Sequence, residues 1–252
     1  MIAKYTDRLH GTASEVVTRR AADPMGLTTY GRTFPDGPSR FVLRALSMAG
    51  GFDVVHVHSL DRVVPWLKVL RRGKPVILHY HGTDILGRWN EKKGRWERAD
   101  FVAYSTPNLA EGAPVRAVQV PNPVDTELFH PREGERRTGS ALAIRYGMDD
   151  AVKAKARELS LDLTIVDRGS VPYSQMPALL SMFEYFIDFR RPPGFDRPVM
   201  SMGKAALESL ASGCKAIGWE GEVQEGLPEE HRPESVAARW FEAYGRLAGR
   251  ER

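Results

Sequence analysis

The sequence predicts an α/β protein with two doubly wound, Rossmann-like domains. Short apolar runs alternate with segments of helical spacing along the whole chain. The runs Val54-Val55 and Val76-Ile77-Leu78 are apolar on both faces, which is typical of parallel strands covered by helices on both sides. A polar, proline-rich segment over residues 121–140 separates the two halves. These three observations together favour two layered α/β domains.

The composition excludes several other classes of protein architecture. The chain has 252 residues, 42% apolar and 27% charged, with 23 Gly and 17 Pro, which excludes collagen, low-complexity disorder and coiled coil as the main architecture. The single cysteine, Cys214, excludes an internal disulfide and a cysteine-based zinc site. No run approaches the roughly 18 apolar residues that cross a bilayer, and residues 1–11 lack the apolar core of a signal peptide. We therefore expect a cytoplasmic protein.

Element by element, the first half is expected to hold five strands. The polar residues 132–140 follow two prolines and predict a hinge, which puts the domain boundary at residue 131. The second half alternates strands and helices again, and Gly213 follows the third of its helices as a C-terminal cap should. The expected strands are 14–18, 53–58, 75–81, 101–105, 115–120, 141–145, 163–166, 185–189 and 215–219, and the expected helices of the second half are 149–160, 174–183, 201–212 and 233–247.

The first candidate site follows the predicted strand 75–81. Ligands of open parallel sheets bind at the carboxyl ends of the strands. His79 and His81 share one face of this strand, and Gly82 lets the backbone approach a ligand closely. The alternative is that both histidines are bonded to neighbouring carbonyl groups.

A second histidine pair raises a metal alternative. His56 and His58, together with His79, His81 and Asp84, are enough ligands for a zinc or two-metal hydrolase. The two pairs lie on different predicted strands, whose ends need not converge, and no carboxylate-rich motif follows them. The metal hydrolase is therefore the minor alternative.

The second candidate site is the predicted helix 201–212. One stripe of this helix is apolar, and the opposite stripe is polar. Its start combines a predicted Ser201 cap, the small Gly203 and the cation Lys204, which suits a diphosphate, and Glu208 can accept hydrogen bonds from ribose hydroxyls. The alternative is a solvated face with a Lys204–Glu208 pair. The polar stripe is Ser201, Lys204, Glu208 and Ser212, and the apolar stripe is Met202, Ala206, Leu207, Leu210 and Ala211.

Four strings in this order resemble glycosyltransferase family 4: FDVVHVH (52–58), LHYHGTD (78–84), VPNPVDTELFHP (120–131) and ALESLASG (206–213). The resemblance runs from about residue 14 to about residue 219. It implies a GT-B-like fold, with two Rossmann-like domains facing a cleft: an acceptor-side domain over 1–131 and a nucleotide-sugar-binding domain over 132–252. It also implies a retaining hexosyltransferase that needs no metal and no other cofactor. The donor would be a nucleoside-diphosphate sugar, and the acceptor a lipid-linked molecule or another glycan.

The resemblance also assigns roles to single residues. His81 matches the histidine near the reacting carbon, with Gly82 beside it, and Glu208 matches the carboxylate that binds the ribose. Met200, Ser201, Met202 and Gly203 correspond to the loop whose amides hold sugar and phosphate. Arg145 is the candidate cation for the diphosphate. Possible substitutes for it are Lys204, Arg190, Arg191 and Arg197.

Three departures from the family pattern modify this expectation. The arginine and lysine that clamp the diphosphate in the family have no clear match here, and Arg145 is the only candidate after the first strand of the second domain. The family has a pair of glutamates eight positions apart, of which Glu208 matches the second. Met200 stands where the first would be, so we expect an unusual donor sugar. The chain starts at the helix that residues 2–9 resemble, where the family first has a strand and a glycine turn, so we expect an opened sheet and an altered acceptor site. The alternative function is a catalytically degenerate protein that binds a sugar nucleotide.

Positive charge is concentrated in the first half. Residues 1–130 contain 18 Lys and Arg against 13 Asp and Glu, which suggests an anionic partner. Trp89 and Trp96 lie seven positions apart within the basic segment 88–98, and a second basic segment covers 62–74. Rings beside cations suit an anionic membrane surface, and the alternative is that both rings pack on the sheet. Nucleic acid is not expected, because no recognition fold accompanies the charge.

Overall fold

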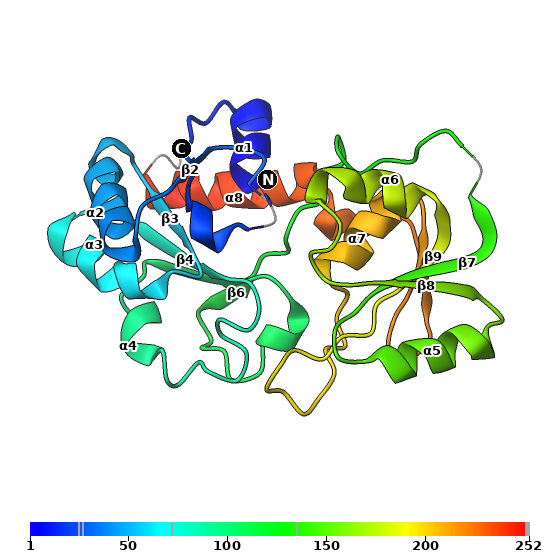
Figure 1. Cartoon of the computed structure of the whole chain (residues 1–252). Helices are drawn as coiled ribbons and strands as arrows, with labels where there is room; N and C mark the ends of the chain where they lie inside the picture. Colours follow the sequence, from blue (N-terminus) through cyan, green and yellow to red (C-terminus); the bar gives the residue numbers. More distant parts are fainter. Residues whose placement is uncertain (25, 27, 72, 135, 250–252) are drawn as a thin grey trace. The chain divides into compact units, whose positions relative to one another are not determined.

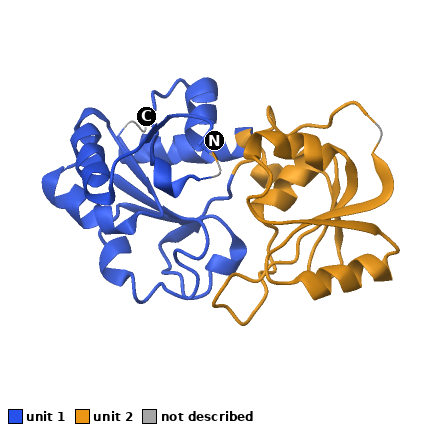
Figure 2. Cartoon of the chain, in the orientation of Figure 1, with its two compact units in different colours: residues 1–24, 28–122, 234–252 blue, residues 25–27, 123–233 orange. Residues whose placement is uncertain are grey.

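The chain forms two compact units (Figure 2). The computed structural model describes residues 1–24, 26, 28–71, 73–134 and 136–249. Unit 1 comprises residues 1–24, 28–122 and 234–252, and unit 2 comprises 25–27 and 123–233. The division differs from the predicted boundary at 131. The reason is that helix α8 (Pro233–Leu247) packs Val236 and Trp240 into the core of unit 1, against Ile77 of its sheet.

Unit 1 is built on a parallel sheet of four strands in the order β3-β4-β5-β6 (Figure 1). The sheet strands lie within four of the predicted segments, and they are β3 (Val55–His58), β4 (Val76–Tyr80), β5 (Phe101–Tyr104) and β6 (Ala117–Gln119). Among the described residues β3 pairs only with β4, so β3 is an edge strand. A separate parallel pair contains β1 (Val17–Arg19), which overlaps the predicted strand 14–18, and β2 (Arg32–Phe34), which was not predicted. The helices before α8 are α1 (Ile2–His10), α2 (Pro38–Met48), α3 (Val64–Leu70) and α4 (Lys93–Trp96).

Alternation along β4 divides the core of unit 1 into two layers. Val76, Leu78 and Tyr80 point to one face, where they pack with α3 and with two tryptophans. Ile77 points to the other face, where it packs with Trp240 of α8. Since both faces are covered, the strand is apolar almost throughout, as the sequence predicted.

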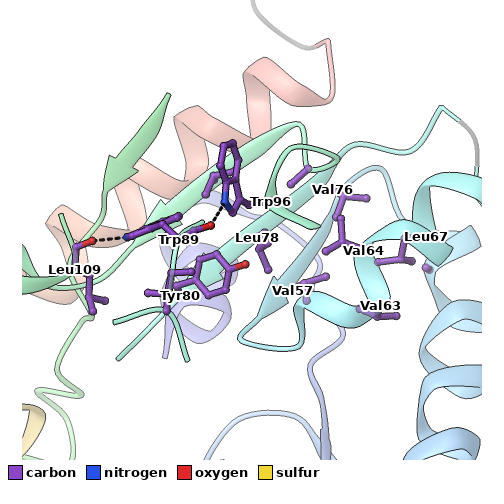
Figure 3. Packing of buried hydrophobic residues seen from close by; sticks show 14 of the residues in the cluster. Val57, Val63, Val64, Leu67, Val76, Leu78, Tyr80, Trp89, Trp96 and Leu109 are labelled. Atoms are coloured by element: carbon purple, nitrogen blue, oxygen red, sulfur yellow. Dashed lines mark hydrogen bonds between the residues drawn. The ribbon is translucent and has the colours of Figure 1, made fainter. Parts of the chain in front are cut away.

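Both tryptophans of the basic segment are buried, which corrects the expected membrane-facing stripe (Figure 3). Trp89 is 3% exposed and Trp96 is 9% exposed. The indole N–H of Trp89 donates to the Leu109 carbonyl at 2.8 Å, and that of Trp96 donates to the Trp89 carbonyl at 2.8 Å. Each ring therefore fills the core and satisfies its one donor there, which is the alternative considered above.

Two cations of the same segment are held by a buried carboxylate. Asp61, which is 3% exposed, lies 2.6 Å from Nζ of Lys92 and 3.0 Å from a guanidinium nitrogen of Arg95. The Tyr80 hydroxyl donates to Asp61 at 3.3 Å. Part of the positive charge of residues 88–98 is thus matched inside unit 1 and does not serve a membrane surface.

Unit 2 contains a sheet in the order β11-β10-β9-β7-β8, parallel except for β11. Its strands are β7 (Arg137–Ile144), β8 (Asp162–Val166), β9 (Phe183–Ile187), β10 (Lys215–Ile217) and β11 (Val223–Glu225), and its helices are α5 (Asp149–Glu158), α6 (Met176–Ser181) and α7 (Lys204–Ala211). The alternation predicted from the sequence is confirmed, apart from β11, which was not predicted. The predicted hinge 132–140 is wrong at its end, because β7 already starts at Arg137.

Helices cover both faces of the unit 2 sheet. Leu142 and Phe186 pack with α6 and α7 on one face, while Ala143 and Ile187 pack with α5 on the other. The predicted α/β class with two Rossmann-like units is therefore confirmed. The connections reverse direction in the sheet of unit 2, as in a doubly wound sheet, whereas the described strands of the unit 1 sheet follow one another in sequence order. Across the described residues, every helix is too short or too polar to span a lipid bilayer.

The buried ion pair of unit 1 leads to a stability prediction. Asp61→Ala leaves Lys92 buried without its carboxylate, so we expect a loss of about 3–5 kcal/mol in the free energy of unfolding, measured in urea. Glu97→Ala is the matched control, because its pair with Lys93 is exposed and 3.7 Å long, and we expect a change within about 0.5 kcal/mol. Equal effects of the two substitutions would contradict a structural role for Asp61.

Candidate functional site

A cavity of about 430 Å³ lies where the connections of the unit 2 sheet reverse direction. The chain runs from β7 through α5, on one face of the sheet, to β8. It then runs through α6, on the opposite face, to β9, which neighbours β7 on the side away from β8. Ligands of doubly wound sheets bind at such a switch point, outside the carboxyl ends of the strands. The loop after β7 and Arg191, after β9, line this cavity together. Its lining residues are Arg145, Gly147, Met148, Asp149, Asp150, Ala151 and Arg191.

The two cations of the cavity differ in their partners. Arg145 pairs with Asp149 and with Asp167, both at 2.7 Å, so its charge is already matched. Arg191 is exposed, and its guanidinium donates to the Gly147 carbonyl at 3.1 Å. In the part of the chain that the structure describes, Arg191 forms no ion pair. Arg191, a substitute in the sequence analysis, is therefore better placed than Arg145 to meet an anion.

Gly147 lets the two loops of the cavity approach. Its φ is +75°, and a Cβ there would lie 3.0 Å from the Arg191 carbonyl oxygen. The Arg191 N–H donates to the Tyr146 carbonyl at 2.9 Å, which joins the loop after β9 to the loop after β7. Gly147 was not predicted, although a glycine in the loop that follows a strand is a recognisable signal.

The loop after β9 is fastened to the start of α7 by a buried carboxylate. Asp188 accepts the Gly203 N–H at 2.6 Å and pairs with Nε of Arg190 at 2.8 Å. The Arg190 guanidinium also bonds the Ser201 carbonyl and lies where a side chain at position 203 would collide with it. Burial raises the pKa of Asp188, and Arg190 and the Gly203 amide oppose the increase.

These contacts correct two expectations about α7. The N-terminal cap is Gly203, without a side-chain cap bond, so Ser201 does not cap the helix. Glu208 and Ser212 are buried, so the predicted polar stripe is solvated only at its start, where Lys204 is exposed. The physical reason is that helix α7 packs with Tyr173 and the loop residues on the side expected to face water. Met200 and Arg197 are exposed on the loop, and Met202 is partly buried.

Glu208 occupies a small polar cluster inside unit 2. It is 4% exposed, and its Oε1 accepts the Tyr173 hydroxyl at 2.6 Å and lies 3.4 Å from Nζ of Lys204. The Lys204 ammonium also lies 4.7 Å from the centre of the Tyr173 ring. Oε1 of this carboxylate is thus held by both neighbours.

Opposing effects act on the ionisation of Glu208. Burial raises the pKa of this carboxyl group, while the Lys204 charge and the Tyr173 hydroxyl lower it. The negative charge of Glu208 in turn helps burial to raise the pKa of Tyr173, so that hydroxyl stays a donor at neutral pH. Tyr173 was not identified from the sequence, because its contact with Glu208 joins residues 35 positions apart.

In unit 1, the loop after β4 is closed by Asp84. The N–H groups of His81 and Gly82 both donate to this carboxylate, at 3.1 Å and 2.7 Å for the shorter contacts. The His81 ring lies between two partners. Its Nδ1 lies 2.9 Å from Asn122 Oδ1, and its Nε2 lies 2.8 Å from Nδ1 of His58. A Cβ at Gly82 would meet open space, which agrees with the expected room for a ligand.

The two histidine pairs converge. His58 lies opposite His79 in the β3–β4 register, and His56 lies opposite Ile77, so all four rings project from one face. The rings of His56 and His58 are 4.2 Å apart, and those of His79 and His81 are 4.1 Å apart. Burial lowers the pKa of His56 to about 3 and that of His79 well below its usual range, so both are neutral at pH 7.

Comparisons with known proteins add little to this geometry. No protein-family model and no curated protein matches the chain. Among solved structures, the sucrose-phosphate synthase of Thermosynechococcus elongatus is similar, with a TM-score of 0.46 and 14% sequence identity, over 84% of this chain and 71% of that chain. A similarity at this level says nothing of the activity of this chain.

Proposed function

We propose that this protein is a glycosyltransferase that moves a sugar from a nucleoside-diphosphate sugar to an acceptor. The observation that carries the proposal is the switch-point cavity of unit 2, with Arg191 at its wall. A cavity at this place in a doubly wound sheet suits a nucleotide, and an arginine without a carboxylate partner suits its phosphates. The four strings that resemble glycosyltransferase family 4 support the same reading.

Within this proposal, Glu208 binds the ribose. Its Oε1 is held by Tyr173 and Lys204, which fixes the carboxylate, and Oε2 accepts a hydrogen bond from a ribose hydroxyl. A hydrogen bond to a charged acceptor contributes about 1.5–3 kcal/mol. The pair with Lys204 therefore positions the carboxylate and is not merely a surface contact.

The chemistry we propose depends on the leaving group. When the bond between the sugar and the diphosphate breaks, negative charge builds up on the diphosphate, and cations or amides that face it lower the barrier. Arg191 supplies this positive charge without a metal ion at the phosphates. The resemblance gives His81 its place near the reacting carbon and implies retention of configuration. The acceptor is a lipid-linked molecule or another glycan.

A catalytically degenerate sugar-nucleotide-binding protein is the second candidate. Asp188 already takes up the Gly203 amide, and Arg190 covers that glycine, so the start of α7 is closed by the protein's own groups. Turnover separates the two candidates. With unit 2 saturated by a donor, an enzyme releases nucleoside diphosphate when membrane or glycan extracts are added, whereas a degenerate protein retains the intact donor.

A surface formed by α2 and α3 is the proposed contact with a membrane. Leu43 on α2 is 67% exposed and Trp66 on α3 is 59% exposed, and Val69 and Leu70 are exposed on the same short helix. Arg71 ties the ends of the two helices together by donating to the Leu46 carbonyl at 2.8 Å. Exposed cations flank the apolar residues, namely Arg40 and Arg44 on α2 and Arg62 in the turn before α3. We place an anionic lipid surface here because apolar and basic groups occur side by side.

Nucleotide binding tests the donor site. Arg191→Ala should weaken the affinity for nucleoside diphosphates about 10- to 100-fold, measured by calorimetry, because a charge-assisted hydrogen bond is lost. Affinity for the nucleoside alone should not change. Arg157→Ala, an exposed arginine on α5 outside the cavity, is the control. An Arg191→Ala protein that binds diphosphates as tightly as the wild type would rule out the proposed phosphate site.

Sedimentation with lipid vesicles tests the membrane surface. The double variant Leu43→Ser, Trp66→Ser should bind vesicles with anionic lipids about 10-fold or more weakly than the wild type, because burying each side chain contributes about 1.5–3 kcal/mol. The control is Val115→Ser, Leu159→Ser, which removes exposed apolar groups elsewhere. Identical binding by both double variants, or no vesicle binding by the wild type, would refute this surface.

A further inference from the structure

The histidine cluster of unit 1 has more nitrogen donors than hydrogen-bond partners. His79 is fully buried, and among the described residues neither of its ring nitrogens makes a hydrogen bond. The Val120 main chain lies near this ring and favours its protonated form, but falls short of hydrogen-bond geometry. Nε2 of His56 is buried and unpartnered as well. Buried polar atoms are rarely left unpaired, so these nitrogens point to a missing partner.

The donors are also close enough to share one ion. One ring nitrogen from each of His56, His58 and His79 can be chosen so that all three lie within 4.8 Å of one another. A zinc ion binds imidazole nitrogen at about 2.0–2.1 Å, so two nitrogens on one ion are separated by about 4 Å at most. The rings need to approach by about an ångström. His58 is exposed at the edge of the sheet, which gives an ion a path of entry.

The outer contacts orient the rings as a metal site requires. Metal-bound histidines use their second nitrogen for a hydrogen bond that fixes the ring. Nδ1 of His56 lies 2.8 Å from the Tyr244 hydroxyl. Asn122 Oδ1 can only accept, so Nδ1 of His81 carries the proton and Nε2 of His81 is an acceptor. Nδ1 of His58 therefore donates its proton to Nε2 of His81. In this tautomer, Nε2 of His58 has a free lone pair that can bind an ion.

We propose that His56, His58 and His79 form a binding site for Zn²⁺ or a similar divalent transition-metal ion. Imidazole is a preferred ligand of these ions, and three protein ligands leave a fourth position open. Tyr244 and the His81–Asn122 pair form its outer contacts. All three ligands belong to unit 1, and His58 bonds the His81 ring, so the role of the ion is to hold that ring in place. This departs from the expectation that no residue binds a metal.

The inference does not depend on the proposed function, because its readout is metal binding. Untagged full-length protein, freed of metal with a chelator, is titrated with Zn²⁺ against a fluorescent zinc indicator. We expect one Zn²⁺ per chain. His58→Gln should lower the affinity about 100-fold or more, and His58 is exposed, so this variant should fold. Tyr244→Phe should lower the affinity about 10-fold through the loss of an outer contact.

His130→Gln is the matched control, because His130 is an exposed histidine in unit 2, outside the cluster. Its affinity for Zn²⁺ should equal that of the wild type. Co²⁺ in place of Zn²⁺ should give the visible absorption of a four-coordinate site in the wild type and not in His58→Gln. The proposal is overturned if the wild type takes up no stoichiometric Zn²⁺, or if His58→Gln and His130→Gln bind it equally well.

Discussion

Parallel pairing of the strands is the constraint on which the functional part of the molecule depends. In a parallel sheet, the carboxyl ends of all strands meet at one edge, whatever their separation along the chain. The pairing of β7 with β9 brings Arg145 and Arg191 to one cavity. The pairing of β3 with β4 brings His58 beside His79. Both clusters of polar groups are therefore consequences of strand register.

Buried charge in each unit is matched locally. Asp61 takes up Lys92 in unit 1, while Glu208 and Asp188 take up Lys204 and Arg190 in unit 2. Removing such charges from water is unfavourable unless a partner offsets it. The groups left over are the informative ones, because a partner from outside the chain can satisfy them. Among the described residues they are the charge of Arg191, which forms no ion pair, and the buried nitrogens of His56 and His79 that lack a hydrogen bond.

Central strands such as β4 and β7 were predictable because they are buried on both faces, which leaves short, continuous apolar runs in the sequence. The short β2 and β11 lack such runs and were missed. The place of α8 was missed for a different reason. Its amphipathic pattern shows that a face is buried, but the pattern does not say that Trp240 packs on Ile77, more than 160 residues earlier.

The candidate site was predicted less completely than the fold. Residues next to strand ends, such as His81 and Arg145, could be found because position in a parallel sheet already indicates function. Tyr173 and Asp188 could not, since each acts through a partner that is distant in the sequence. The convergence of the histidines depends on register, which a sequence does not reveal. Trp89 and Trp96 have the spacing of one helical face, but the spacing does not reveal that both rings are buried in the core.

Thermal melts with UDP, GDP, ADP and their sugar conjugates show whether unit 2 binds a nucleoside diphosphate. A ligand at 100 times its dissociation constant adds about 2.7 kcal/mol to stability, which gives a clear rise in melting temperature. We expect the melting temperature to rise with the diphosphates of one base and to rise less with the matching monophosphate. Adding a chelator should change neither rise. No rise with any nucleotide would contradict it.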